Sequence, residues 1–306
     1  MKKQLLSLLL SSILLTNVVK AQDATDDSPI KVNTLLLTVP LSVKDKNGRN
    51  VPGLKKENFS IFQNGEKQNI EYFFNEEAPM NVAILLDTSA STREVLDKIQ
   101  KAARDFVKVL RPEDKGLIVS FDARTLFLSE LTADKKELSK AISQTRIAEQ
   151  EGSDMNAAVV QIVKNYFASF KGRKAIIVLS DGMVFRRDVS TQQTLETLQG
   201  ADTLFYPIVF KTKYYVEAMA RPKKPLSVEM LEFLADQTSG RFYEKNASNL
   251  KEAFQSIADE LKNQYLIGFY PQTGDAGNPS SRIKMAVDRK DLRIETKKKG
   301  VYIKTE

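Results

Sequence analysis

The spacing of apolar residues changes twice along this chain and divides it into three regions. In residues 31–74 short stretches rich in Val, Leu, Ile and Phe alternate with turns, and Asn47-Gly48 and Asn64-Gly65 are typical of type I′ hairpins. After Lys262 apolar and polar residues alternate again, as in Ile283-Lys284-Met285. Each end region predicts few strands. We therefore expect the two to pair into one small β domain.

The central region has the pattern of a doubly wound α/β domain. Val82-Ala83-Ile84-Leu85-Leu86 is an uninterrupted apolar run, typical of a parallel strand covered on both faces. Apolar residues then recur at helical spacing from Val95 to Val109. Further strands are expected at 116–121, 125–128, 175–179, 203–209 and 241–243, and helices at 135–145, 155–170, 191–198, 228–237 and 250–261. This alternation predicts a mostly parallel sheet with helices on both faces.

The first 21 residues have the pattern of a secretory signal peptide. Lys2-Lys3 precedes an apolar run from Leu5 to Leu15, and small residues, Val19 and Ala21, stand before the expected cleavage point. The run is shorter than the roughly 20 residues of a membrane-spanning helix, and no later segment approaches that length. The expected organisation is a signal peptide at 1–21, a disordered leader at 22–30, an N-terminal β segment at 31–76, the α/β domain at 77–262 and a C-terminal β segment at 263–306. We expect the mature protein to be exported, to a periplasm or out of the cell.

Composition narrows the chemistry that this chain can perform. It contains no cysteine, histidine or tryptophan, which argues against the thiolate and imidazole sites of zinc, haem, blue copper and iron–sulfur clusters. Cysteine proteases, histidine-assisted hydrolases and disulfide scaffolds are excluded as well. Hard cations with oxygen ligands stay available. Removing Lys2, Lys3 and Lys20 with the signal peptide lowers the net charge from +7 to +4, so the mature protein is mildly basic.

Polar residues gather where strands of the predicted α/β domain end. Asp87, Ser89 and Ser91 follow the first strand, Asp181 follows the strand at 175–179, and Ser153 begins a helix between them. Ligands of doubly wound sheets bind beyond the carboxyl ends of the strands. Two carboxylates there repel each other unless a cation or a proton intervenes. With three hydroxyls they form an oxygen set suited to Mg²⁺, or to Mn²⁺ or Ca²⁺.

Each of these residues also fits a purely structural role. Ser91 and Glu94 have the spacing of a capping box. Ser153 or Asp154 suits the N-cap of the next helix, and Asp181-Gly182 suits a turn at a strand end. Single residues therefore favour the structural interpretation, whereas the set as a whole favours a metal site.

The run Asp87-Thr88-Ser89-Ala90-Ser91 resembles the D-x-S-x-S motif of the von Willebrand factor type A domain. The resemblance covers about residues 79–262, and the flanks are similar to secreted bacterial proteins related to this family. It implies a metal-ion-dependent adhesion site whose open coordination position accepts an Asp or Glu carboxylate of a partner protein, with no bond broken. The ligands that it implies are Asp87, Ser89, Ser91, Ser153 in place of the usual Thr, and Asp181, with Asp154 as an alternative oxygen donor.

Two groups of residues near this site have compositions typical of protein contacts. Phe185, Arg186 and Arg187 follow the third loop, although Phe185 also suits packing beneath it. Tyr214 and Tyr215 lie in the long connection from Lys211 to Pro225, for which we expect a binding or lid role.

The C-terminal β segment is rich in basic residues. They fit a solvated strand face with a protected edge, or a contact with an anionic lipid or polysaccharide surface of the cell envelope. Nucleic acid is not an expected partner.

The expected function is a non-enzymatic, divalent-metal-dependent protein-binding module of adhesion type. One alternative is a Mg²⁺-dependent hydrolase or phosphatase that uses Asp87, and another is a structural envelope protein with an empty metal site. The sequence argues against the hydrolase, because no aspartate follows Asp87 at two residues' distance, and neither a Gly-x-x-x-x-Gly-Lys loop nor a Gly-x-Ser-x-Gly elbow occurs.

Overall fold

The computed structural model describes residues 37–75, 77–148, 152–170, 172–183, 188–271, 283–296 and 301–303. The predicted signal peptide and leader lie outside these residues. Within the described part of the chain, no helix is long and apolar enough to cross a membrane.

A six-stranded sheet with the order β10-β9-β8-β5-β6-β7 organises the central region. Its strands are β5 (Met80–Asp87), β6 (Lys115–Phe121), β7 (Thr125–Phe127), β8 (Arg173–Ser180), β9 (Thr203–Phe210) and β10 (Tyr243–Lys245). Neighbouring strands run parallel except β6 and β7. From β5 the chain winds first toward β6 and later to β8 on the other side. The point where the strand order reverses therefore lies at β5 and β8, where ligands bind in such sheets.

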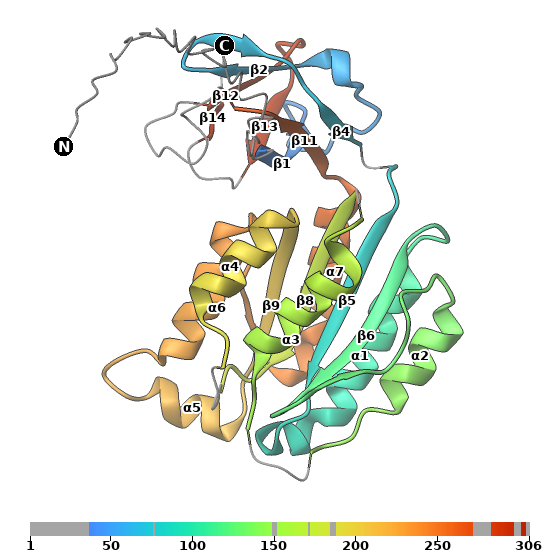
Figure 1. The fold of residues 1–306 in the computed structure, drawn as a ribbon, viewed down its shortest axis with the longest axis vertical. Coiled ribbons are helices and arrows are strands. Elements are labelled where there is room, and N and C mark those ends of the chain that lie inside the picture. Colours follow the sequence, from blue (N-terminus) through green and yellow to red (C-terminus); the bar gives the residue numbers. More distant parts are fainter. Residues whose placement is uncertain are drawn as a thin grey trace, which may run out of the picture. The chain divides into compact units, whose positions relative to one another are not determined.

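Helices cover both faces of this sheet (Figure 1), which is why β5, β8 and β9 are buried throughout. On one face, α1 (Leu96–Val109), α2 (Lys135–Ser143) and α7 (Leu250–Lys262) pack with Ile84. On the other, α3 (Met155–Ile162), α4 (Thr191–Gly200) and α6 (Leu226–Gln237) pack with Leu85. A short helix, α5 (Lys213–Met219), precedes α6. The predicted doubly wound α/β fold is confirmed.

The segments before and after this domain form two four-stranded sheets. One has the order β13-β1-β11-β4, with β1 (Leu37–Lys44), β4 (Tyr72–Phe74), β11 (Tyr265–Phe269) and β13 (Arg293–Thr296). The other has the order β14-β12-β2-β3, with β2 (Phe59–Gln63), β3 (Glu66–Gln68), β12 (Ile283–Val287) and β14 (Val301–Ile303). Strand β1 pairs with β11 and β13, and β2 pairs with β12. One apolar core holds residues of both sheets, including Val39, Ile61 and Met285. The expected β domain built from both end segments is thus present.

Of the local predictions, one hairpin turn is confirmed and others need correction. Asn64-Gly65 has positive φ at both residues, 51° and 94°, as a type I′ turn requires. At Asn47-Gly48 only the glycine has positive φ, because the Asp45 carboxylate holds this turn by accepting hydrogen bonds from the Asn47 and Arg49 backbone N–H groups. The helix expected at 155–170 is α-helical only to Ile162 and continues as a π-helical turn, Val163–Phe167. Short 3₁₀ helices lie at Lys56–Asn58, Ala90–Val95 and Ala247–Asn249.

Candidate metal centre

The carboxyl ends of β5 and β8 are adjacent at the point where the strand order reverses. Leu86 and Leu179 are paired in register, so Asp87 and Ser180 follow them side by side, and Asp181 comes next. The loop before α3 is tied to the same edge, because the Asp154 N–H donates to the Asp122 carbonyl, just beyond β6, at 2.8 Å. The structure thus gathers residues from three separate segments of the sequence at one edge of the sheet.

Asp87 is fully buried, and hydrogen bonds from Ser180 and from both the backbone and the side chain of Ser89 hold its carboxyl. Its Oδ1 accepts from the Ser89 backbone N–H at 2.9 Å, and its Oδ2 accepts from the Ser180 hydroxyl at 2.5 Å. Burial and the nearby Asp181 carboxyl raise the pKa of Asp87 to about 7. The side chain therefore has a fixed position, and its surroundings disfavour the charged form.

Asp181 is also fully buried, and burial raises its pKa above the ordinary value for aspartate. Its Oδ1 accepts from the Met183 N–H at 3.1 Å, and its Oδ2 accepts from the Thr212 hydroxyl at 3.0 Å. The Ser91 side chain forms a further hydrogen bond to it. Hydroxyls and backbone N–H groups hold this carboxyl, as they hold Asp87.

The loop after β5 positions Ser89 and Ser91 together. Their hydroxyl oxygens lie 3.1 Å apart, and the Thr92 hydroxyl fixes the loop by donating to the carbonyls of Asp87 and Ser89. Ser89 stands at the N-cap of the 3₁₀ helix, whereas Ser91 lies inside that helix. The capping-box interpretation of Ser91 is therefore wrong.

Ser153 and Asp154 differ sharply in how their side chains are used. Asp154 caps α3, and its two carboxylate oxygens accept from Ala157 N–H at 3.0 Å and from Asp188 N–H at 3.1 Å. Ser153 is fully buried, and its hydroxyl has no hydrogen-bond partner among the described residues. Leaving such a group without a partner costs about 1–3 kcal/mol. Of the two neighbours, Ser153 has the oxygen that is free for a ligand.

Two residues that sequence reasoning did not single out support the buried carboxyls. Ser180 is the last residue of β8 and orients Asp87, while Thr212 follows β9 and orients Asp181. Both stand at the carboxyl end of a strand next to the site, so strand position was the signal that could have revealed them. Thr212 also accepts the Tyr215 N–H at 3.2 Å, which connects Asp181 to the first turn of α5.

The residues proposed for partner contact fall into three cases. Phe185, Arg186 and Arg187 lie outside the described residues. Tyr214 is 46% exposed on α5, whereas Tyr215 is only 2% exposed and packs in the core. Tyr215 therefore cannot contact a partner in this conformation. The connection from 211 to 225 is also not an open loop, since it contains α5.

The donor set of this edge consists of oxygen atoms only. The described residues contain no cluster of three or more His, Cys, Asp or Glu side chains suited to a metal ion. A cation here would rely on two carboxyls and on neutral hydroxyls. Such oxygen donors suit hard divalent cations, which also accept water and an incoming ligand.

Comparison with known proteins finds a family match within the α/β domain. Residues 82–183 match the family model of the von Willebrand factor type A domain. An uncharacterized protein of Borreliella burgdorferi is 23% identical over 236 residues, which is 71% of this chain and 64% of that protein, or less than two thirds of its length.

Two solved structures also match part of this chain. Proximal thread matrix protein 1 from the mussel byssus, in a structure with a zinc-occupied MIDAS motif, has a TM-score of 0.53 at 14% identity and covers 66% of this chain and 50% of its own. BatB from Bacteroides thetaiotaomicron has a TM-score of 0.48 at 16% identity and covers 60% and 97%.

Proposed function

We propose that the domain whose residues 82–183 match the von Willebrand factor type A model is a divalent-metal-dependent protein-binding module of adhesion type. One observation carries the proposal: two buried carboxyls, and a buried hydroxyl with no partner among the described residues, lie at the edge where this fold binds ligands. The residues that would hold the ion are Asp87, Ser89, Ser91, Ser153 and Asp181. Bound between these oxygens, a divalent cation would supply the missing positive charge and leave a coordination position for a partner's Asp or Glu carboxylate.

The electrostatics of the site support a partner that brings negative charge. The site contributes only the two carboxyls of Asp87 and Asp181, while its other three donors are neutral hydroxyls. Little negative charge therefore opposes an approaching carboxylate. Ser180 and Thr212 keep the two carboxyls in place through hydrogen bonds. An oxygen donor set favours Mg²⁺, with Mn²⁺ and Ca²⁺ as alternatives. The mussel protein with a zinc-occupied motif places Zn²⁺ among the ions to test.

A binding role fits the surroundings of Asp87 better than nucleophilic catalysis. Both of its carboxylate oxygens accept hydrogen bonds from the protein, and the side chain is fully buried. A nucleophile needs an oxygen that can reach its substrate. Phosphatase activity that depends on Asp87 would overturn the proposal in favour of a hydrolase.

Thermal unfolding with and without divalent cations tests the metal site through Ser153. Cation should raise the melting temperature of the wild type, and a chelator should reverse the rise. Ser153→Ala should lose most of this response without lowering the metal-free melting temperature, because its hydroxyl has no hydrogen-bond partner among the described residues. Ser256→Ala, an exposed hydroxyl on α7, is the control and should respond like the wild type. An unchanged wild-type melting curve with Mg²⁺, Mn²⁺, Ca²⁺ and Zn²⁺ would contradict the proposal.

Capture from the native cell envelope tests the partner. Protein retained by the wild type in Mg²⁺ should be released by chelator and absent with Asp87→Ala. Retention that survives both treatments would favour a structural protein that docks without the metal site.

Export is part of the same proposal and rests on residues 1–21. We infer that the mature protein works in a periplasm or outside the cell and begins at Gln22. N-terminal sequencing of the protein from its native cells checks this, and a chain that retains its first residues would contradict it.

A further inference from the structure

A hollow of about 640 Å³ lies on the β domain, among residues that the metal site does not use. Its floor is the outer face of the sheet that contains β2 and β12. In this sheet Ser60 pairs with Ala286, and Phe62 pairs with Lys284. The intervening Ile61 and Met285 point into the core, so their neighbours face outward. The small side chains of Ser60 and Ala286 leave room there, and Phe62 is half-buried beside them.

The walls of this hollow are charged and predominantly basic. Five basic side chains line it, and three acidic ones accompany them. The basic residues are Lys46, Lys284, Arg289, Lys290 and Arg293, and the acidic residues are Asp45, Asp288 and Asp291.

The three carboxylates are engaged by other groups of the protein. Asp45 binds Arg49 and Asp291 pairs with Arg289 at 2.6 Å, so both are balanced by a cation. Asp288 accepts from the neutral Asn58 amide at 2.9 Å and keeps its negative charge. Lys284 and Lys290, by contrast, form no ion pair within the described part of the chain. Among the described residues, these two lysines therefore offer positive charge that no acidic side chain neutralises.

We propose that this hollow, defined by Phe62, Lys284 and Lys290, binds an acidic oligosaccharide segment of the uronic-acid type. The apolar face of a sugar ring packs on an aromatic side chain, as Phe62 provides, and the sugar carboxylates would pair with the two lysines. The volume is that of a small-molecule pocket, roughly 300–1,000 Å³. A concave site of this size suits a saccharide chain better than the flat surface of a lipid bilayer.

Binding to the hollow does not rest on the proposed metal site. Its lining residues belong to the β domain, whereas the proposed ligands belong to the α/β domain. Chelator and Asp87→Ala should therefore leave saccharide binding unchanged, so that the two proposals can fail separately.

The test measures binding of oligogalacturonate to the full chain by calorimetry, with a neutral dextran fragment of similar size as the control ligand. Lys284→Ala with Lys290→Ala should weaken binding about three- to tenfold, the range expected for two exposed charge pairs. Lys98→Ala with Lys251→Ala removes the same charge elsewhere and should bind like the wild type. Phe62→Ser should also weaken binding, with its melting temperature checked for folding.

Three outcomes would overturn the proposal. Equal weakening by the control pair of lysine substitutions would mean that net charge alone attracts the polymer. Equal binding of the dextran would mean that the sugar carboxylates do not contribute to binding. Binding to phosphatidylglycerol vesicles together with no binding of oligogalacturonate would assign the hollow to a lipid surface instead.

Discussion

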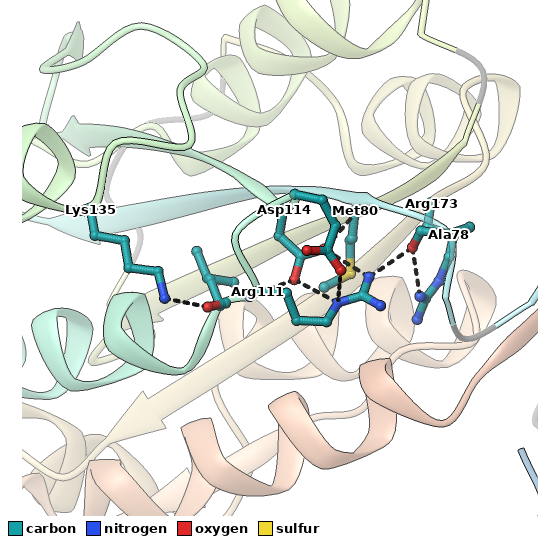
Figure 2. Close-up of polar contacts among 8 residues, drawn as sticks. Ala78, Met80, Arg111, Asp114, Lys135 and Arg173 are labelled. Atoms are coloured by element: carbon teal, nitrogen blue, oxygen red, sulfur yellow. Dashed lines mark hydrogen bonds and ion pairs between the residues drawn. The ribbon is translucent and has the colours of Figure 1, made fainter.

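The central sheet has an amino edge, where its parallel strands begin, and a carboxyl edge, where they end. These two edges bury acidic side chains in opposite ways. At the amino edge, Asp114 is 4% exposed and faces the Arg111 guanidinium (Figure 2). Its Oδ1 pairs with Arg111 Nη2 at 2.9 Å and accepts from the Met80 N–H at 3.0 Å. Burial acts to raise the pKa of Asp114, but the hydrogen bonds and charge of Arg111 outweigh it, so the pKa lies below its ordinary value. At the carboxyl edge, Asp87 and Asp181 have raised pKa values and hydroxyl partners in place of a cation.

At the amino edge, the buried carboxyl has a structural role and belongs to a network of polar contacts. Arg111 and Arg173 both donate to the Ala78 carbonyl, and Lys135 donates to the Leu110 carbonyl, so one polar network joins the beginnings of β5 and β8 to the end of α1 (Figure 2). The negative charge of Asp114 is balanced inside the protein by the Arg111 guanidinium. Among the described residues no basic side chain pairs with Asp87 or Asp181, which supports the divalent-cation site proposed at the opposite edge.

Neutralising Asp114 tests the amino edge and should have the largest effect. Asp114→Asn removes the buried carboxylate partner of Arg111, which keeps its pair with the exposed Glu113, and weakens the hold on Met80. We therefore expect about 3 kcal/mol lower free energy of unfolding. Urea unfolding at neutral pH measures it. Asp105→Ala, an exposed partner of Lys101 and Lys108, is the control and should change stability by less than about 1 kcal/mol. A loss at Asp114 no larger than this control would remove the contrast.

The equivalent change at the carboxyl edge should act in the opposite direction. Asp87→Asn removes a buried charge beside Asp181 and still offers an oxygen to the Ser89 N–H. In chelator we expect the free energy of unfolding to rise by about 1 kcal/mol. The stabilisation by added cation should disappear in the same variant. Destabilisation in chelator as large as that of Asp114→Asn would mean that both edges are structural.

Lowering the pH should reduce the difference in stability between the wild type and Asp114→Asn. This is the smallest of the expected effects. The pKa of Asp114 is lower in the folded chain than its ordinary value of 3.8, so the unfolded chain binds a proton first as the pH falls. Its contribution to stability is then present above about pH 4 and is lost as the pH falls through the folded-state pKa. Urea unfolding of the wild type and Asp114→Asn at several pH values between 6 and 3 should show converging stabilities. A difference that stays constant with pH would mean that the charge of Asp114 does not determine the stability of this edge.

The alternation of strands and helices was predictable because it depends on local spacing of apolar residues. Val82 to Leu86 forms the interior of β5, and Ala175 to Leu179 lies within β8. Turn geometry was less predictable from sequence. Asn64-Gly65 has the expected positive φ angles. At Asn47-Gly48 the Asn47 N–H donates to the Asp45 carboxylate, a contact that the dipeptide alone does not reveal.

The individual side chains of the site depended more strongly on the folded chain. Ser153 and Asp154 are adjacent and both polar, yet the Asp188 N–H, 34 residues away, engages one oxygen of Asp154 and none of Ser153. Tyr214 and Tyr215 are identical neighbours, and the direction of α5 buries only the second. Sequence position alone does not separate the members of either pair.

The sequence by itself determined the doubly wound domain, the flanking β segments and the strand ends at which acidic residues stand, because apolar periodicity and the alternation of strands and helices are local properties of the chain. Only the tertiary structure decided which side-chain oxygens accept hydrogen bonds and which carboxyls pair with a basic side chain. It also decided that β1 lies between β11 and β13. Those features depend on hydrogen bonds and burial between segments far apart in the sequence. Their partners are brought together only when the chain is folded.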